Sequence, residues 1–171
     1  MTDHITDSSS GFQKDINVLD TKIETSLNQL FPKRDIRRVL LLGPPDVDKS
    51  LFNFSSAKRG RNYNYPLYGP ALAATWLRQD GIDVRILNLN HKLLEACSTA
   101  ATADEFNFDQ AWQTPVHEIL ESYRPDVVGI SCMFTQTHLA TVELSSFLKK
   151  FWPNLPIALG GVHITNSYIS G

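Results

Sequence analysis

The amino-acid sequence predicts an α/β protein with a doubly wound parallel sheet. Short apolar runs alternate along the chain with longer segments in which apolar residues recur at helical spacing. Residues 39–42 (VLLL) and the centre of 126–131 (DVVGIS) are continuously apolar, which is typical of strands covered on both faces. Residues 82–86 instead alternate between apolar and charged side chains, which indicates an edge strand.

A fourth strand is predicted at 156–160 (PIALG). The four strands and their connecting helices fit the flavodoxin-like or Rossmann-like strand order 2-1-3-4, with the fifth strand of that arrangement missing. The last strand is apolar at consecutive positions, as if it had a neighbour on each side. The eleven residues after Gly160 are too few for another helix and a fifth strand, so we expect a C-terminally truncated domain or a partner on that edge.

Three helices are expected between the strands. The first begins at Gly69, with Pro70 in its first turn, where a proline costs no hydrogen bond. The second is expected to open at Thr114-Pro115 for the same reason, and the third to begin near Gln136.

Composition limits the class of protein. The chain has 171 residues, of which 42% are hydrophobic and 20% charged, and these values suit one soluble domain with its own core. Residues 1–37 are predicted to be a polar N-terminal extension that carries a short amphipathic helix at 15–31, and residues 38–171 to form the α/β domain. The net charge of −2 argues against nucleic-acid binding, although 58–61 (KRGR) is basic.

The location is expected to be cytoplasmic. The chain has no apolar run near ~18 residues, so no membrane span is predicted, and its first ten residues do not resemble a signal peptide. Cys97 and Cys132 have no metal-binding or redox spacing and fit a reducing compartment.

The loop after the first strand comes close to a phosphate-binding motif. Residues 43–50 (GPPDVDKS) match GxxxxGK[ST] except at Asp48, which stands in place of glycine. Pro44 and Pro45 have no N–H to donate, and Asp46 and Asp48 would repel a phosphate. The segment after Ser50 has no helical period and is predicted to be a loop, so we reject a phosphate-binding loop here.

The position of this loop still predicts a binding site. In open α/β sheets, ligands bind beyond the carboxyl ends of the strands, at the switch point between strands one and three. The segments 43–48, 131–137 and 160–165 should converge there. They supply polar groups at Ser131, Thr135, Thr137, His163 and Thr165, and bare backbone at Gly160 and Gly161.

Five segments in order resemble the N-terminal cobalamin-binding domain of cobalamin-dependent radical S-adenosylmethionine enzymes. They are LLLGPP, YPLYGPALAATWLRQDG, IDVRILN, RPDVVGISCMFTQT and FWPNLPIALGGVHITN, and together they span about residues 38–166. The resemblance implies that cobalamin binds base-off, with the dimethylbenzimidazole tail near strands three and four and the corrin over the strand ends. Glycines can open a slot for such a tail in an otherwise close-packed core.

The same resemblance implies a set of cofactor-binding residues, with no catalytic residue and no protein ligand to the metal. They are Pro44, Pro45, Asp46, Ser131, Met133, Thr135, Gly160, Gly161 and His163. Met133 stands where leucine is common in methionine-synthase-type domains. Those domains also carry DxHxxG after strand one, whose histidine ligates cobalt, whereas this chain has DVDKSL. The departure points to the radical subfamily, with cobalt that lacks a protein histidine.

Catalysis is expected to need a further domain. With two cysteines the chain cannot supply the CxxxCxxC motif of a radical S-adenosylmethionine enzyme. A catalytic domain in cis or in trans would add a 4Fe-4S cluster and S-adenosylmethionine, and the whole enzyme would be a methyltransferase. Two alternatives stay open: a flavodoxin-like domain that binds a nucleotide or another phosphorylated small molecule, and a fragment that binds nothing.

Overall fold

The computed structural model describes residues 20–29, 31 and 35–170. The chain divides into two compact units, Met1–Asp35 and Ile36–Gly171. In the first unit, residues 20–29 form a helix that leaves Ile23 and Leu27 about half exposed. This helix lies within the segment 15–31 where the sequence predicts one, and positions 15–19 and 30 of that segment lie outside the described residues.

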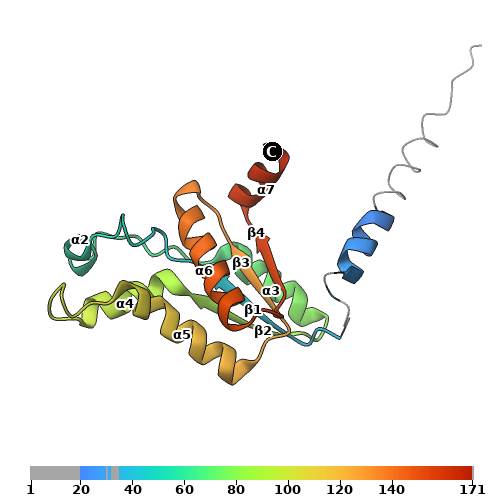
Figure 1. Cartoon of the computed structure of the whole chain (residues 1–171), viewed down its shortest axis with the longest axis horizontal. Coiled ribbons are helices and arrows are strands. Elements are labelled where there is room, and N and C mark those ends of the chain that lie inside the picture. The colour runs from blue at the N-terminus through green and yellow to red at the C-terminus, as the bar shows by residue number, and fades with distance from the viewer. Residues whose placement is uncertain (1–19, 30, 32–34, 171) are drawn as a thin grey trace, which may run out of the picture. The chain divides into compact units, whose positions relative to one another are not determined.

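The second unit is built on a four-stranded, fully parallel sheet (Figure 1). Its strands are β1 (Arg38–Gly43), β2 (Asp83–Asn88), β3 (Val127–Ser131) and β4 (Ile157–Gly160). Their order is β2-β1-β3-β4, which confirms the predicted topology and the α/β class.

Six α-helices of this unit connect or follow the strands. They are α2 (Phe54–Lys58), α3 (Tyr68–Gln79), α4 (Leu89–Thr99), α5 (Phe108–Tyr123), α6 (His138–Phe151) and α7 (Val162–Ser170), and a 3-10 turn, η1 (Thr135–Thr137), precedes α6. None of the helices in the described ranges is both long enough and apolar enough to cross a bilayer.

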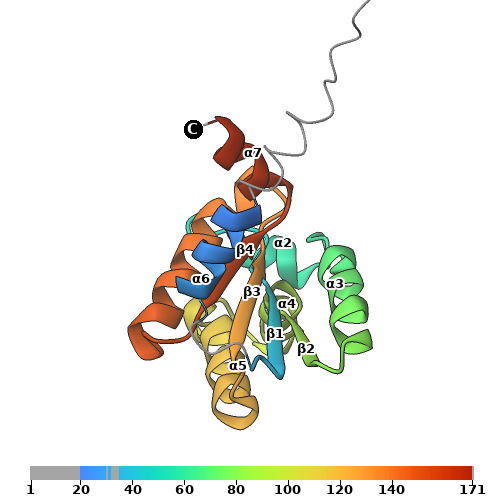
Figure 2. The ribbon, with the colours of Figure 1, turned by 90° about the vertical axis from the view of Figure 1, so that its right-hand side faces the viewer.

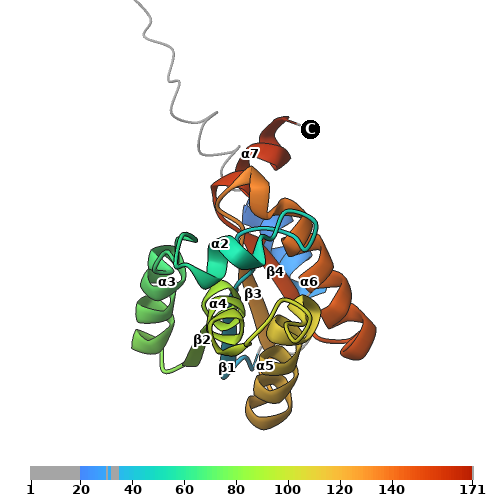
Figure 3. The same cartoon turned by 90° about the vertical axis from the view of Figure 1, so that its left-hand side faces the viewer.

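The two faces of the sheet are covered unequally. The main core joins one face to α4, α5 and α6 through side chains such as Leu40, Leu93, Val116, Val128 and Leu144. The other face carries α3, whose Ala74 packs on Val39 of β1 and Val84 of β2. Figures 2 and 3 show α3 on one side of the sheet and α5 and α6 on the opposite side. Over β3 and β4, the α3 side of the sheet is therefore open.

Helix α5 begins earlier than the sequence prediction. It starts at Phe108, where the Asn107 side chain accepts a hydrogen bond from the Gln110 N–H at 3.0 Å. Thr114-Pro115 does not open the helix, because Pro115 lies in its middle. The expected first-turn proline is thus an interior proline, which leaves the Ala111 carbonyl without its usual helical donor.

Two further helices, α2 and α7, lie in segments for which the sequence predicts no helix. The segment after Ser50, predicted to be a loop, contains α2, which is capped by the Asn53 side chain. The eleven residues after Gly160, expected to be too few for another helix and a fifth strand together, contain the helix α7. The fourth strand is at the edge of the sheet, as the predicted order 2-1-3-4 requires, because β4 pairs with β3 alone among the described strands and Leu159 is 47% exposed.

Candidate functional site

The three predicted segments do meet at the carboxyl ends of the strands. In the parallel register Ser131 pairs with Gly160, and the β1 loop leaves the sheet beside them after Gly43. A cavity of about 220 Å³ lies at this edge. It is lined by Gly43, Pro44, Asp46, Tyr65, Pro66, Leu67, Tyr68, Gly69, Pro70, Asn88, Ser131, Met133, Phe134 and Thr137.

A shallower groove of about 350 Å³ adjoins this cavity on the open part of the sheet. Its walls are the N-terminal half of α3 and the α3 side of β1, β3 and β4, and it is lined by Leu41, Gly69, Pro70, Ala73, Gly129, Ile130, Ser131, Met133, Ala158, Leu159, Gly160 and Gly161. Gly69, Pro70, Ser131 and Met133 border both spaces. The strand-end cavity and the sheet groove are therefore neighbouring parts of one site.

Small residues make the groove. Leu41, Gly129 and Ala158 are aligned across the sheet, and Ser131 and Gly160 form the next row on β3 and β4. Three of these five positions are glycine or alanine, so these residues contribute little side-chain volume above β3 and β4, although the Leu41 side chain reaches over Gly129. Among the described residues, the half-buried Ser131 hydroxyl has no hydrogen-bond partner, and it borders the groove and the cavity.

The two glycines after β4 have different roles. Gly161 has a φ of +105°, and a Cβ there would overlap the Cys132 backbone carbonyl oxygen. This position therefore requires glycine for close packing of the β3 and β4 ends. A Cβ at Gly160 would meet nothing within 4 Å, so the absence of a side chain at Gly160 leaves the groove open.

Asp46 is fixed at the wall of the cavity by Asn90 of α4. The Asn90 Nδ2 donates to the Asp46 carboxylate at 2.9 Å, and the Asp46 backbone N–H donates to Asn90 Oδ1 at 3.2 Å. Asn90 also donates to the Tyr63 carbonyl at 3.0 Å, which ties the Tyr63 segment to the same pair. Partial burial raises the pKa of Asp46 to about 6.

The Asp48 side chain does not line the cavity and instead stabilises the turn that leads to Ser50. Its side chain is 5% exposed and accepts hydrogen bonds from the Ser50 N–H, at 2.8 Å, and the Ser50 hydroxyl. These bonds hold the pKa of Asp48 below its ordinary value. Lys49 forms an ion pair with Asp109 at 2.6 Å, so the lysine that resembled a phosphate ligand binds α5 instead.

Three of the predicted residues lie outside both spaces. Pro45 is buried beside the cavity, and Thr135 and His163 form a chain of contacts at the ends of β3 and β4. His163 Nε2 lies 3.1 Å from His138 Nδ1, and His163 Nδ1 lies 3.4 Å from the Thr135 hydroxyl. His138 is exposed at the first position of α6 and contacts His163.

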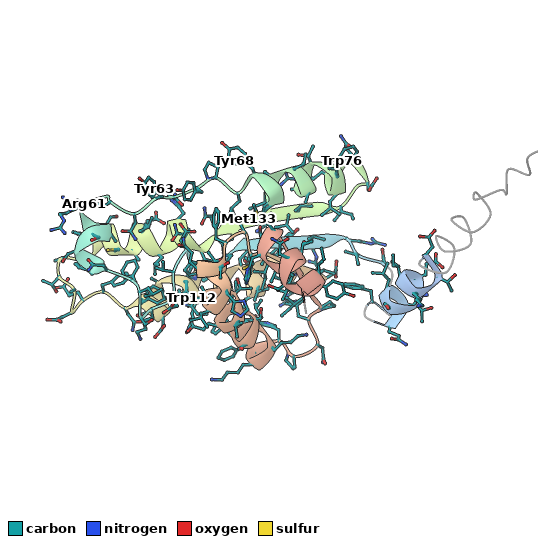
Figure 4. All side chains as sticks on the ribbon, turned by 90° about the horizontal axis from the view of Figure 1, so that it is seen from above. Arg61, Tyr63, Tyr68, Trp76, Trp112 and Met133 are labelled. Atoms are coloured by element: carbon teal, nitrogen blue, oxygen red, sulfur yellow. The ribbon has the colours of Figure 1, made fainter. Side chains whose placement is uncertain are left out.

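The aromatic wall of the cavity is not among the residues predicted from the sequence. Residues 65–70 (YPLYGP) line it, and the Tyr65 ring stands 5.6 Å from Tyr63 and 6.3 Å from Phe134. Figure 4 shows Tyr63, Tyr68 and Trp76 along one edge of the domain, with Met133 beside that edge. The signal was present in the sequence, since this proline- and aromatic-rich segment leads into and includes the first turn of α3, the helix that packs on β1.

One comparison with known proteins gives a match. Residues 61–169, well over half of the chain, match the model of a family described as the B12 binding domain. The matched range begins after β1 and its loop and runs into α7. No curated protein and no solved structure matches the chain.

Proposed function

The chain belongs to the B12-binding domain family, and from this premise we propose that it holds cobalamin base-off, with the tail in the sheet groove and the corrin over the strand-end cavity. The observation that carries the proposal is the open, small-residue surface over β3 and β4, directly continuous with a cavity at the strand ends. A flat, aromatic tail needs such a slot, because packed protein cores leave no spare volume.

The residues of the groove fit a nucleotide tail. Ala158 and Gly160 leave β4 accessible to a planar ring, and Pro70 and Ala73 of α3 offer an apolar opposite wall. The Ser131 hydroxyl, without a partner among the described residues, can donate to a nitrogen or an oxygen of the tail. A hydrogen bond to the ligand is directional, so the half-buried Ser131 hydroxyl would contribute orientation as well as affinity.

The cavity suits the edge of the corrin. Its wall combines apolar surface, from Pro44, Leu67 and Met133, with amide and carboxyl groups at Asn88 and Asp46. A corrin offers the same combination, since its ring is apolar and its rim carries carboxamides. When bound, cobalamin would supply a cobalt centre able to carry a methyl group.

We also propose that the cobalt has no histidine ligand from the loop after β1, because that loop contains no histidine. In DVDKSL the aspartate that replaces the family histidine is Asp48, and its hydrogen bonds to Ser50 keep it within its own turn. This arrangement supports the radical S-adenosylmethionine subfamily, whose members include many without that histidine. The partner would then be a catalytic domain, in cis or in trans, with a 4Fe-4S cluster and S-adenosylmethionine, and the reaction would be methyl transfer.

Cobalamin binding is tested by titrating the full chain with hydroxocobalamin and removing free ligand by gel filtration. We expect retained cobalamin with an absorption spectrum in which dimethylbenzimidazole no longer coordinates cobalt. Retention of flavin mononucleotide or ATP in parallel samples, with no retention of cobalamin, would overturn the proposal. The link to radical chemistry is tested separately, by searching the DNA downstream of codon 171 and its neighbouring genes for a frame that encodes CxxxCxxC.

A further inference from the structure

Asp46 is the single carboxylate among the described residues that line the strand-end cavity. It is not free to turn away, because Asn90 donates to its side chain and accepts from its backbone N–H. Asn90 itself is 6% exposed and is held by the Tyr63 carbonyl. The cavity therefore presents a carboxyl group whose position is set by a buried amide.

The ionisable side chains on the elements next to Asp46 contact other residues. On its own loop, Asp48 accepts from Ser50 and Lys49 pairs with Asp109 of α5. On α4, His91 lies 3.0 Å from the Asn64 side chain. Tyr65 and Tyr68 bring phenol groups to the cavity wall, and the β3–α6 connection brings Ser131, Met133, Phe134 and Thr137, none of which is charged.

In the part of the chain that the structure describes, no ion pair joins Asp46 to a cationic side chain, and burial raises its pKa to about 6. Covering the cavity with a large neutral ligand would remove more water from the carboxyl group and would disfavour the charged form further. A neutral carboxyl group also gains a proton that it can donate, which an ionised carboxylate cannot do. The rim of a corrin carries carboxamide carbonyls that accept such a bond.

We propose that Asp46 takes up a proton when cobalamin binds and donates it, as a hydrogen bond, to a carboxamide carbonyl on the corrin rim. This inference rests on the proposed function and adds that binding is coupled to pH through one residue. The free carboxyl group is already protonated below about pH 6, so binding there costs no protonation. Above that pH each bound ligand requires one proton, and the affinity should fall by up to about tenfold per pH unit.

The test measures the Kd of the full chain for methylcobalamin between pH 5.5 and 8, because the axial methyl group does not titrate in this range. We expect the Kd of the wild-type chain to rise at least about tenfold from pH 6 to pH 8. Asp46→Asn carries a permanently neutral amide, so its Kd should change less than about twofold over this range. Asp104→Asn, at an exposed turn, is the matched control and should keep the wild-type dependence.

Calorimetry in two buffers with different ionisation enthalpies counts protons directly on the wild-type chain and needs no variant. We expect close to one proton taken up per cobalamin at pH 7. Binding with no proton uptake and a pH-independent Kd would overturn this inference and leave the proposed function standing. Absence of binding at every pH would overturn both.

Discussion

Asp46 and Asp48 lie two positions apart and have opposite acid–base behaviour. Burial in the cavity wall raises the pKa of Asp46, whereas hydrogen bonds from Ser50 lower that of Asp48. In the sequence DVD, both aspartates are expected to present a negative charge to a ligand. The difference arises from the burial of Asp46 in the fold and from the local turn of Asp48 with Ser50. Asp46 is held in the cavity wall by the Asn90 amide from 44 positions later in the chain, a tertiary contact that local sequence patterns do not reveal.

The pKa of Asp46 predicts how stability depends on pH. A carboxyl group whose pKa is higher in the folded than in the unfolded state binds more protons when the chain is folded. Its contribution to the free energy of unfolding is therefore fully present below about pH 4 and is lost as pH rises through about 6. The free energy of unfolding of the wild-type chain should therefore fall, relative to that of Asp46→Asn, between pH 4.5 and 7. Urea unfolding at both pH values measures this difference, and a parallel response of the two proteins would contradict the assignment.

Gly160 and Gly161 allow a matched test of the strand ends. Gly161→Ala should destabilise the chain by about 1–3 kcal/mol, because φ is +105° and the new Cβ would overlap the Cys132 carbonyl oxygen. Gly160→Ala should change stability by less than about 0.5 kcal/mol, since nothing lies within 4 Å of its Cβ. Equal effects of the two substitutions in urea unfolding would show that the glycine pair acts as a simple flexible turn.

At the scale of elements, the strands were predictable and several helix ends were not. Continuous apolar runs indicate β1 and β3, and alternation indicates β2. A strand covered on both faces needs apolar residues at successive positions, whereas a strand covered on one face needs them only at every second position. The starts of α2, α4 and α5 depend instead on asparagine caps. Asn53, Asn88 and Asn107 each accept a backbone N–H from three residues on, and this repeated signal was available in the sequence.

Helix α5 yields a prediction about its interior proline. Pro115→Ala should restore an N–H donor to the Ala111 carbonyl and stabilise the chain by about 1 kcal/mol or more. Pro70→Ala serves as the contrast, because Pro70 lies in the first turn of α3, where no such bond is missing, and is buried. Thermal unfolding would show a higher Tm for the first variant only. A lower Tm for Pro115→Ala would mean that the proline fits a bend that the core requires.

At the scale of the whole molecule, the unequal covering of the sheet by helices creates the groove of the candidate site. α4, α5 and α6 complete one face, and α3 covers only the β1 and β2 part of the other. From topology alone, the sequence predicts a binding site at the strand ends, where the structure has a cavity. It could not show the groove over β3 and β4, since that space depends on which side of the sheet each helix packs. The glycines and Ala158 become informative only once the register aligns them.

The most direct test asks whether the groove holds the tail of cobalamin. The Kd values of the wild-type chain for cobalamin and for cobinamide, which lacks the nucleotide tail, are compared with those of Ala158→Leu and Ala71→Leu. Ala158 lines the groove, whereas Ala71 is exposed on α3 away from it, so the same change is made inside and outside the site. We predict that the wild-type chain and Ala71→Leu prefer cobalamin by about tenfold or more, and that Ala158→Leu loses this preference. Equal affinity of the wild-type chain for the two corrinoids, or an unchanged preference in Ala158→Leu, would contradict the account.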